Sequence, residues 1–223
     1  MNTKLFFEAI LKFLLGIILI GILIFVPANT IRFLNGWLFM GLLFIPMFFA
    51  GIVMMIKAPN LLRIRLDAKE KEREQKSVVA LSGLMFLLGF IIAGLNYRFN
   101  WIKLPDIVVF ISSIIFLLSY LLYVEVLREN TFLSRTIEVK KNQKLIDTGL
   151  YGIVRHPMYF AAIFLFLSIP LILNSFLSFI IFLIYPFIIA KRIKNEEIIL
   201  EKELKGYKEY KNKVKYRLIP FIW

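Results

Sequence analysis

The chain has 223 residues, of which 60% are hydrophobic and 16% aromatic, and its formal net charge is +13. A soluble domain of this size cannot bury so much apolar surface in one core, and apolar runs of membrane-spanning length recur, which predicts a polytopic membrane protein. These runs lack the alternation typical of barrel strands, so we expect helices. The chain contains no cysteine, which excludes disulfides, a thiol nucleophile and a thiolate metal site.

The positive charge flanks the apolar runs and does not form a separate basic domain. This placement favours contact with the anionic lipid bilayer and disfavours nucleic acid as a partner. Lysine and arginine concentrate in the connectors after the second and fourth apolar runs and in the C-terminal tail. The positive-inside bias therefore predicts that both termini lie in the cytoplasm.

The first half of the chain predicts four spans, at about Leu5–Val26, Gly36–Ile56, Val78–Asn96 and Ile107–Val126. The N-terminus has no small-residue cleavage site, so we expect the first span to be retained. The charged connector Lys57–Lys76 alternates in sign at helical spacing, which favours a solvated or interfacial helix.

The apolar stretch Met158–Ala190 is too long for one span and is interrupted by Pro170 and Asn174-Ser175. We therefore expect a helical hairpin with arms at about 158–173 and 176–190, each near the lower length limit for crossing. The following segment, Lys191–Tyr216, repeats apolar residues at helical spacing, which predicts a C-terminal amphipathic helix. The predicted fold is thus an all-α membrane bundle of about six spans, with no internal repeat.

The polar connector Leu127–Leu150 precedes this hairpin, and its β-branched stretch Thr136–Val139 favours extended backbone. The only histidine, His156, follows the connector at the edge of the apolar region, beside Arg155. Ionisable groups at a membrane boundary are costly, so this cluster is a candidate functional site.

Three linked motifs occur in this part of the chain. Residues 149–159 read Gly-Leu-Tyr-Gly-Ile-Val-Arg-His-Pro-Met-Tyr, Arg192 precedes Glu196-Glu197 by one helical turn, and residues 206–210 read Gly-Tyr-Lys-Glu-Tyr before Leu-Ile-Pro at 218–220. Over roughly residues 130–223, the order and spacing of these motifs resemble the isoprenylcysteine carboxyl methyltransferase and phospholipid methyltransferase group of integral membrane methyltransferases.

The resemblance implies S-adenosylmethionine as the methyl donor and a specific set of residues around it. The implied cofactor contacts are Gln143, Lys144, Leu145, Ile146, Tyr151, His156, Pro157, Met158, Tyr159 and Glu196. Arg192 is implied at the substrate, and the candidate catalytic residues are Arg192, Glu196, Glu197 and His156. Thr136 stands where the eukaryotic carboxyl methyltransferases have glutamine, so we expect no cofactor contact from it. On this basis residues 1–127 are N-terminal transmembrane helices, and residues 128–223 carry the cofactor connector, hairpin and catalytic helix of one integrated membrane domain.

The residues themselves are compatible with these roles. No glycine-rich loop follows a predicted strand, so a Rossmann-type methyltransferase domain is absent, and the pocket must form from the cytoplasmic helix ends and the polar connector. Pro157 suits the first turn of a helix. Arg192 and Glu196 share one helix face, and a guanidinium suits a carboxylate or phosphate on a lipid-like substrate. We expect Tyr207 and Tyr210 to serve mainly in packing.

The leading hypothesis is methyl transfer from S-adenosylmethionine to a lipidic or prenylated acceptor, with a carboxylate favoured, as in isoprenylcysteine O-methylation. The alternatives are an NADPH-dependent lipid or sterol-type reductase and a non-enzymatic membrane protein. Residue usage rich in Phe, Ile and Lys points to a prokaryotic source, hence to the inner membrane of a prokaryotic cell. The identity of the acceptor, O- or N-methylation, and the oligomeric state stay open.

Overall fold

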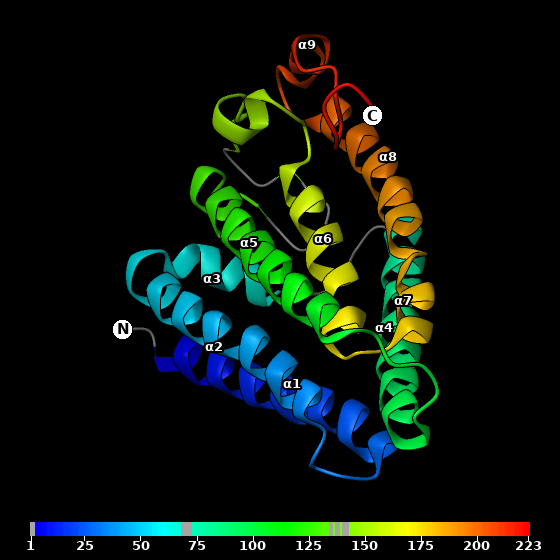
Figure 1. The fold of residues 1–223 in the computed structure, drawn as a ribbon. Helices are drawn as coiled ribbons and strands as arrows, with labels where there is room; N and C mark the ends of the chain where they lie inside the picture. Colours follow the sequence, from blue (N-terminus) through cyan, green and yellow to red (C-terminus); the bar gives the residue numbers. More distant parts are fainter. Residues whose placement is uncertain (1–2, 68–72, 134–135, 137–138, 140–142) are drawn as a thin grey trace.

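The protein is a bundle of helices (Figure 1) in a computed structural model that describes residues 3–67, 73–133, 136, 139 and 143–223. Within these residues all regular secondary structure is helical, as the sequence predicts. In chain order the elements are α1 (Thr3–Ala28), α2 (Leu34–Lys57), α3 (Pro59–Leu66), α4 (Arg73–Phe99), α5 (Asp106–Glu129), η1 (Gly149–Gly152), α6 (Pro157–Ile172), α7 (Phe176–Phe182), α8 (Tyr185–Glu203) and α9 (Tyr207–Lys213).

Five helical stretches of the described chain are long and apolar enough to cross a membrane. They are α1, α2, the stretch Gln75–Phe99 of α4, α5, and the stretch Phe176–Glu203 that contains α7 and α8. The other apolar helix, α6, has 16 residues, whereas a straight crossing takes about 20. Helix length and composition thus define a multi-pass membrane protein, but the predicted count of six spans is not confirmed.

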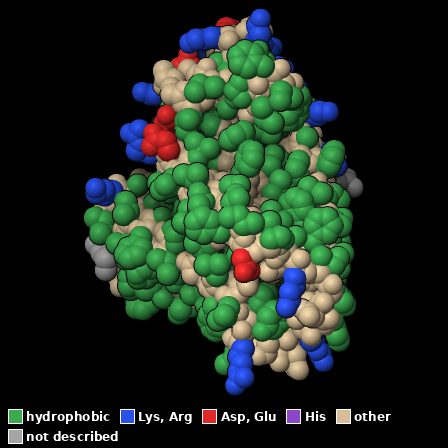
Figure 2. All heavy atoms as spheres, in the orientation of Figure 1, with side chains coloured by type: hydrophobic (Ala, Val, Ile, Leu, Met, Phe, Trp, Pro, Cys, Tyr) green, Lys and Arg blue, Asp and Glu red, His purple; other side chains and the backbone are tan. Residues whose placement is uncertain are grey.

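The outer surface of the bundle is apolar around its middle. Figure 2 shows hydrophobic side chains over most of the middle of one face, with lysine and arginine gathered toward the top and bottom edges. Large side chains such as Leu19 on α1 and Phe110 on α5 are 58% and 63% exposed. Water would penalise such contiguous exposure, whereas acyl chains solvate it, so this surface fits contact with lipid.

The core of the bundle is rich in phenylalanine and includes a close approach between α4 and α7. Phe39, Phe116 and Phe182 are fully buried in it. A Cβ atom on Gly89 of α4 would lie 2.2 Å from the ring of Phe182. The hydroxyl of Ser178 on α7 donates to the carbonyl of Gly89 at 2.8 Å. A small residue here lets two membrane helices approach closely enough for this interhelical hydrogen bond.

The C-terminal hairpin forms, but its second arm differs from the prediction. α6 continues through Pro170, and the turn follows at residues 173–175, where Asn174 has a φ of 55°. The second arm is interrupted between α7 and α8, because Pro186 lies in the first turn of α8 and has no N–H to continue the preceding helix.

The predicted boundary between the hairpin and a separate amphipathic helix is also wrong. α8 runs without interruption from Tyr185 through Lys191 to Glu203. The helix ends there because Leu204 adopts an extended conformation, and the left-handed Gly206, with a φ of 86°, then leads the chain into the short helix α9. Helical structure therefore stops at Lys213 and does not reach Tyr216.

Two expectations for the connectors fall partly outside the described residues. α3 supplies a helix at the start of the Lys57–Lys76 connector, but residues 68–72 are not described. The predicted extended stretch Thr136–Val139 includes residues 137 and 138, which also lie outside the described part.

Candidate functional site

Five elements converge at one end of the bundle and enclose a cavity. They are the C-terminal end of α5, η1, the N-terminus of α6, the second half of α8, and α9, and all but α5 gather near the top of Figure 1. Nine of the predicted cofactor-contact residues line this cavity: Gln143, Lys144, Leu145, Ile146, Tyr151, His156, Met158, Tyr159 and Glu196. Residues from the polar connector and from two separate motifs are therefore brought to one place.

Gly149 joins the polar connector to the end of α5. Its φ is 58°, a conformation that disfavours other residues. Both carboxylate oxygens of Glu129 accept from the backbone N–H of Leu150, at 3.2 and 3.0 Å. A Cβ atom at position 149 would lie 2.1 Å from Glu129 Oε1. The first glycine of the motif is thus required by both conformation and space.

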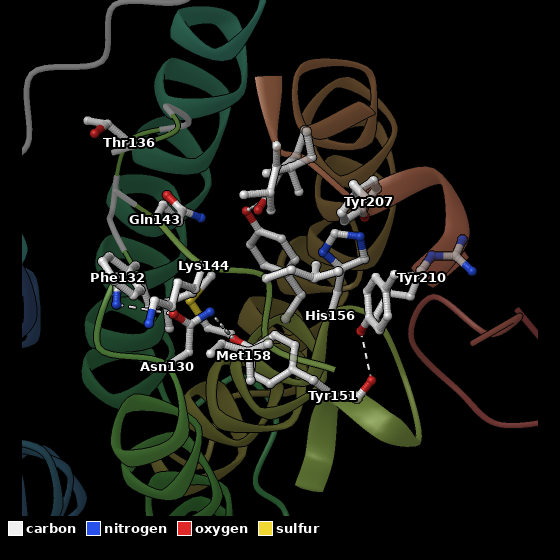
Figure 3. A pocket seen from close by; sticks show the side chains of 18 residues that line it. Asn130, Phe132, Thr136, Gln143, Lys144, Tyr151, His156, Met158, Tyr207 and Tyr210 are labelled. Atoms are coloured by element: carbon white, nitrogen blue, oxygen red, sulfur yellow. Dashed lines mark hydrogen bonds between the residues drawn. The ribbon is translucent and has the colours of Figure 1, made fainter. Parts of the chain in front are cut away.

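Tyr151 connects α5 with α9 across the cavity wall. Asn130 Nδ2 donates to the Tyr151 hydroxyl at 3.2 Å, and the Tyr210 hydroxyl donates to the Tyr151 carbonyl at 2.7 Å (Figure 3). Burial raises the pKa of both phenols above their ordinary value, so both are neutral at physiological pH. The Tyr210 hydroxyl therefore keeps the proton that it donates to the Tyr151 carbonyl.

His156 is held by backbone pairing with the C-terminal segment. The N–H groups of Arg155 and His156 donate to the carbonyls of Tyr216 and Arg217 at 3.0 and 2.9 Å. The His156 carbonyl accepts from the first turn of α6, where Pro157 occupies the initial position as expected. Pro157 itself does not line the cavity, whereas His156 and Met158 on either side of it do.

Tyr159 links Glu196 with Arg192 through its hydroxyl. This hydroxyl donates to Glu196 Oε2 at 2.5 Å and accepts from Arg192 Nε at 2.9 Å. Tyr159 and Glu196 line the cavity, whereas Arg192, which is 9% exposed, lies behind them. The structure therefore brings the predicted arginine and glutamate together through a tyrosine.

Glu197 occupies a different position from its neighbour Glu196. Its carboxylate accepts from Arg155 Nε at 2.7 Å and Arg217 Nε at 2.8 Å, and His156 Nε2 lies 3.3 Å from Glu197 Oε1. Glu197 is 3% exposed and is not among the residues that line the cavity. Its contacts tie α8 to the start of α6 and to the C-terminal segment.

Several lining residues were not predicted from the sequence. They are Asn130, Phe132, Leu133, Thr136, Arg155, Leu200, Leu204, Tyr207 and Tyr210. Tyr207 and Tyr210 carried a usable signal, because two tyrosines three residues apart share one helix face. Asn130 carried none, since nothing in its sequence context marks a helix end that faces a cavity.

The cavity walls are chemically mixed. Glu196, Gln143 and the phenols offer polar groups, whereas Leu145, Ile146 and Met158 offer apolar surface. Among the residues that the structure describes, no group of three or more His, Asp or Glu side chains is placed to hold a metal ion. The fold and site thus define a class: a membrane helical bundle with a cavity of mixed polarity where its last helices end.

Comparison with known proteins agrees with this class. Residues 108–202, somewhat less than half of the chain, match the model of the isoprenylcysteine carboxyl methyltransferase (ICMT) family. This match supports membership of the ICMT family for the segment, in agreement with the resemblance of its motifs. The chain is also 30% identical to the Delta(14)-sterol reductase of Mus musculus over 91 residues, which is 40% of this chain and 22% of the reductase.

Proposed function

We propose that this protein is an integral membrane methyltransferase that binds S-adenosylmethionine in the cavity and methylates a lipid-like acceptor. The ICMT family match supports methyl transfer in a membrane. The observation that carries the proposal is the linked set of Glu196, Tyr159 and Arg192, which joins the polar wall of the cavity to a buried cation.

The donor set of the cavity fits this cofactor. S-adenosylmethionine has two cationic groups, a carboxylate, ribose hydroxyls and an adenine ring, and when bound it supplies an electrophilic methyl group. The Glu196 carboxylate suits the cationic and hydroxyl groups, and Gln143 and Lys144 supply donors. Leu145, Ile146 and the other apolar residues suit the flat base.

We assign Arg192 to binding of the methyl acceptor. Its guanidinium is fixed at Nε by the Tyr159 hydroxyl and is largely buried. A buried guanidinium attracts a carboxylate or phosphate far more strongly than an exposed one does. The acceptor is thus a lipidic or prenylated molecule with an anionic group, and an isoprenylcysteine-like carboxylate is favoured over a phospholipid amine.

A carboxylate acceptor makes modest demands on the protein. It is already nucleophilic at neutral pH, so alignment and exclusion of water matter more than a general base. With an amine acceptor a base is required, and His156 is the candidate that lines the cavity. Glu197 is assigned a positioning role, because its carboxylate is engaged with Arg155 and Arg217.

The same proposal places the cavity at the cytoplasmic side of a prokaryotic inner membrane. The charge distribution supports this orientation, since basic residues concentrate in the connectors and tail at that end. A soluble cofactor can reach a cavity there from the cytoplasm, whereas a hydrophobic acceptor can approach from the bilayer.

The test uses the full-length protein purified in detergent micelles. We expect S-adenosylhomocysteine to bind in calorimetry, and a tritiated methyl group to pass from S-adenosylmethionine to extractable lipid. Arg192→Ala and Glu196→Ala should each reduce turnover by 100-fold or more, on the order of 3 kcal/mol of lost transition-state stabilisation. Lys194→Ala and Glu203→Ala, at exposed positions of the same helix, serve as matched controls.

Two results would contradict the proposal in different ways. Wild-type turnover in both site variants would remove the assignment of Arg192 and Glu196. A nicotinamide requirement without affinity for S-adenosylmethionine would instead select a reductase, the activity named for the murine relative.

A further inference from the structure

The Tyr207 side chain combines burial, a place in the cavity wall and an unused hydroxyl. It is 3% exposed and lines the cavity. Its hydroxyl oxygen is buried and has no hydrogen-bond partner among the residues that the structure describes. Figure 3 places Tyr207 beside His156, on the wall opposite Asn130 and Gln143. A buried hydroxyl without a partner is costly, and such a group in a native structure calls for an explanation.

The other tyrosines of the cavity provide the contrast. Among the described lining residues, Tyr151 accepts from Asn130, Tyr159 bonds both Glu196 and Arg192, and Tyr210 donates to the Tyr151 carbonyl. Each of these hydroxyls is used within the protein. Among the tyrosines that line the cavity, the Tyr207 hydroxyl alone has no partner within the described part of the chain and stays available to a ligand.

The local structure fixes the Tyr207 ring in place. Its backbone N–H donates to the Leu204 carbonyl at 3.2 Å, next to the left-handed Gly206. Its ring meets the Tyr210 ring edge to face, with centroids 5.7 Å apart. A donor held in this way loses little conformational freedom when a ligand arrives.

The Tyr207 hydroxyl is also held in its protonated form. Burial raises its pKa well above the ordinary value, and the charges of Glu197 and Glu196 raise it further. The group is therefore neutral over the whole physiological range and can donate a hydrogen bond. As a donor it suits an acceptor atom of the ligand, and the carboxylate and ribose oxygens of the cofactor are such acceptors.

We infer that Tyr207 is a cofactor-binding residue whose hydroxyl donates to an oxygen of bound S-adenosylmethionine, either the carboxylate or a ribose hydroxyl. This inference rests on the proposed function and adds a contact outside the set that the motifs imply. Tyr207, which we expected to serve mainly in packing, is thus assigned to cofactor binding. Tyr210, whose hydroxyl is bonded within the protein, provides the structural comparison.

The experiment compares Tyr207→Phe with Tyr210→Phe in the full-length protein. Calorimetry with S-adenosylhomocysteine should show about 2- to 12-fold weaker binding for Tyr207→Phe if the lost hydrogen bond is to a neutral ribose hydroxyl, and a larger loss if it is to the charged carboxylate. The melting temperature of the ligand-free protein should stay equal or rise, because the substitution removes an unpaired buried hydroxyl. Tyr210→Phe should lower that melting temperature, because it breaks the hydrogen bond to Tyr151.

A second ligand identifies the oxygen. 5′-Methylthioadenosine has the ribose and the base but no amino-acid end. If the affinity loss of Tyr207→Phe persists with this ligand, the contact is to the ribose; if it disappears, the contact is to the carboxylate.

Unchanged affinity in Tyr207→Phe would overturn the inference and leave the proposed function standing. Weaker binding together with a lower melting temperature of the ligand-free variant would also overturn it, since Tyr207 would then act through the fold. Absence of binding by the wild-type protein would overturn the inference and the proposed function together.

Discussion

At the scale of single residues, Gly149 is the position where backbone conformation and site geometry depend on each other most directly. We predict that Gly149→Ala destabilises the protein by about 1–2 kcal/mol, the cost of a left-handed conformation for a residue with a Cβ atom. The new methyl group would also displace the Glu129 carboxylate from the Leu150 N–H. The affinity for S-adenosylhomocysteine should fall together with the stability. Calorimetry measures the affinity, and thermal unfolding measures the stability.

Gly152→Ala is the matched control for this substitution. Gly152 has no positive φ, and its nearest contact for an added Cβ is 3.4 Å away, at the Asp147 carbonyl. Equal losses of stability in the two variants would show that the left-handed conformation at position 149 does not cause the destabilisation of Gly149→Ala.

Glu197 supports a second prediction at this scale. Glu197→Gln removes the charge that pairs with the buried Arg155 and with Arg217. Leaving a buried cation without its counter-ion costs about 3–5 kcal/mol, so we expect a large fall in melting temperature. Glu203→Gln, at an exposed position six residues further along the chain, should change it little. A Glu197→Gln variant as stable as the wild type would show that this network does not hold the site together.

The sequence predicts well which short segments lie at the cavity, but it predicts poorly which side chains of a helix face it. Short contiguous segments stay together when the chain folds. Two of them therefore supply most of the predicted lining residues: Gln143 to Ile146, and Tyr151, His156, Met158 and Tyr159. Glu196 and Glu197 are adjacent in sequence but about 100° apart around the helix, so they cannot both face the cavity. Which of them does so depends on how α8 packs against α6, and one sequence does not contain that information.

At the scale of elements, the loops opposite the cavity are joined by two asparagines. Asn96 donates to the carbonyls of Ile102 and Asn174 at 3.0 and 3.1 Å and accepts from the Ile102 N–H at 3.2 Å. Asn174 accepts from the Leu104 N–H at 2.6 Å. This pair ties the α4–α5 connection to the α6–α7 turn.

We predict that Asn96→Ala destabilises the protein by about 1–3 kcal/mol, because it leaves buried backbone groups without partners. Affinity for S-adenosylhomocysteine should be unchanged, since α6 with its 16 residues separates this clamp from the cavity. Scanning fluorimetry and calorimetry measure the two quantities, and Lys103→Ala in the same exposed loop is the control. A loss of affinity at unchanged stability would contradict the assignment of a purely structural clamp.

Element boundaries follow from local chemistry only in part. The first four apolar helices occur where hydropathy predicts them, with ends shifted by a few residues. The predicted boundary between Ala190 and Lys191 is wrong, because α8 continues across it to Glu203. Composition marks where a helix leaves an apolar environment, whereas Pro186 and Gly206 mark where α8 and α9 begin.

At the scale of the whole molecule, orientation in the membrane is the property that charge alone predicts. The chain has no cysteine, so single substitutions report topology without a background signal. We predict that a membrane-impermeant maleimide labels Lys103→Cys in intact cells, and labels Lys202→Cys only after permeabilisation. The reverse pattern would place the cavity on the outer side and contradict the proposed access of the cofactor from the cytoplasm.

The proposed function depends most on where the methyl donor binds. The most direct test is a crystal structure of the full-length protein with S-adenosylhomocysteine. The predicted result is ligand density in the cavity between η1, α6 and α9, in contact with both Glu196 and His156. Density elsewhere in the bundle, or a ligand that touches neither residue, would contradict the proposed site.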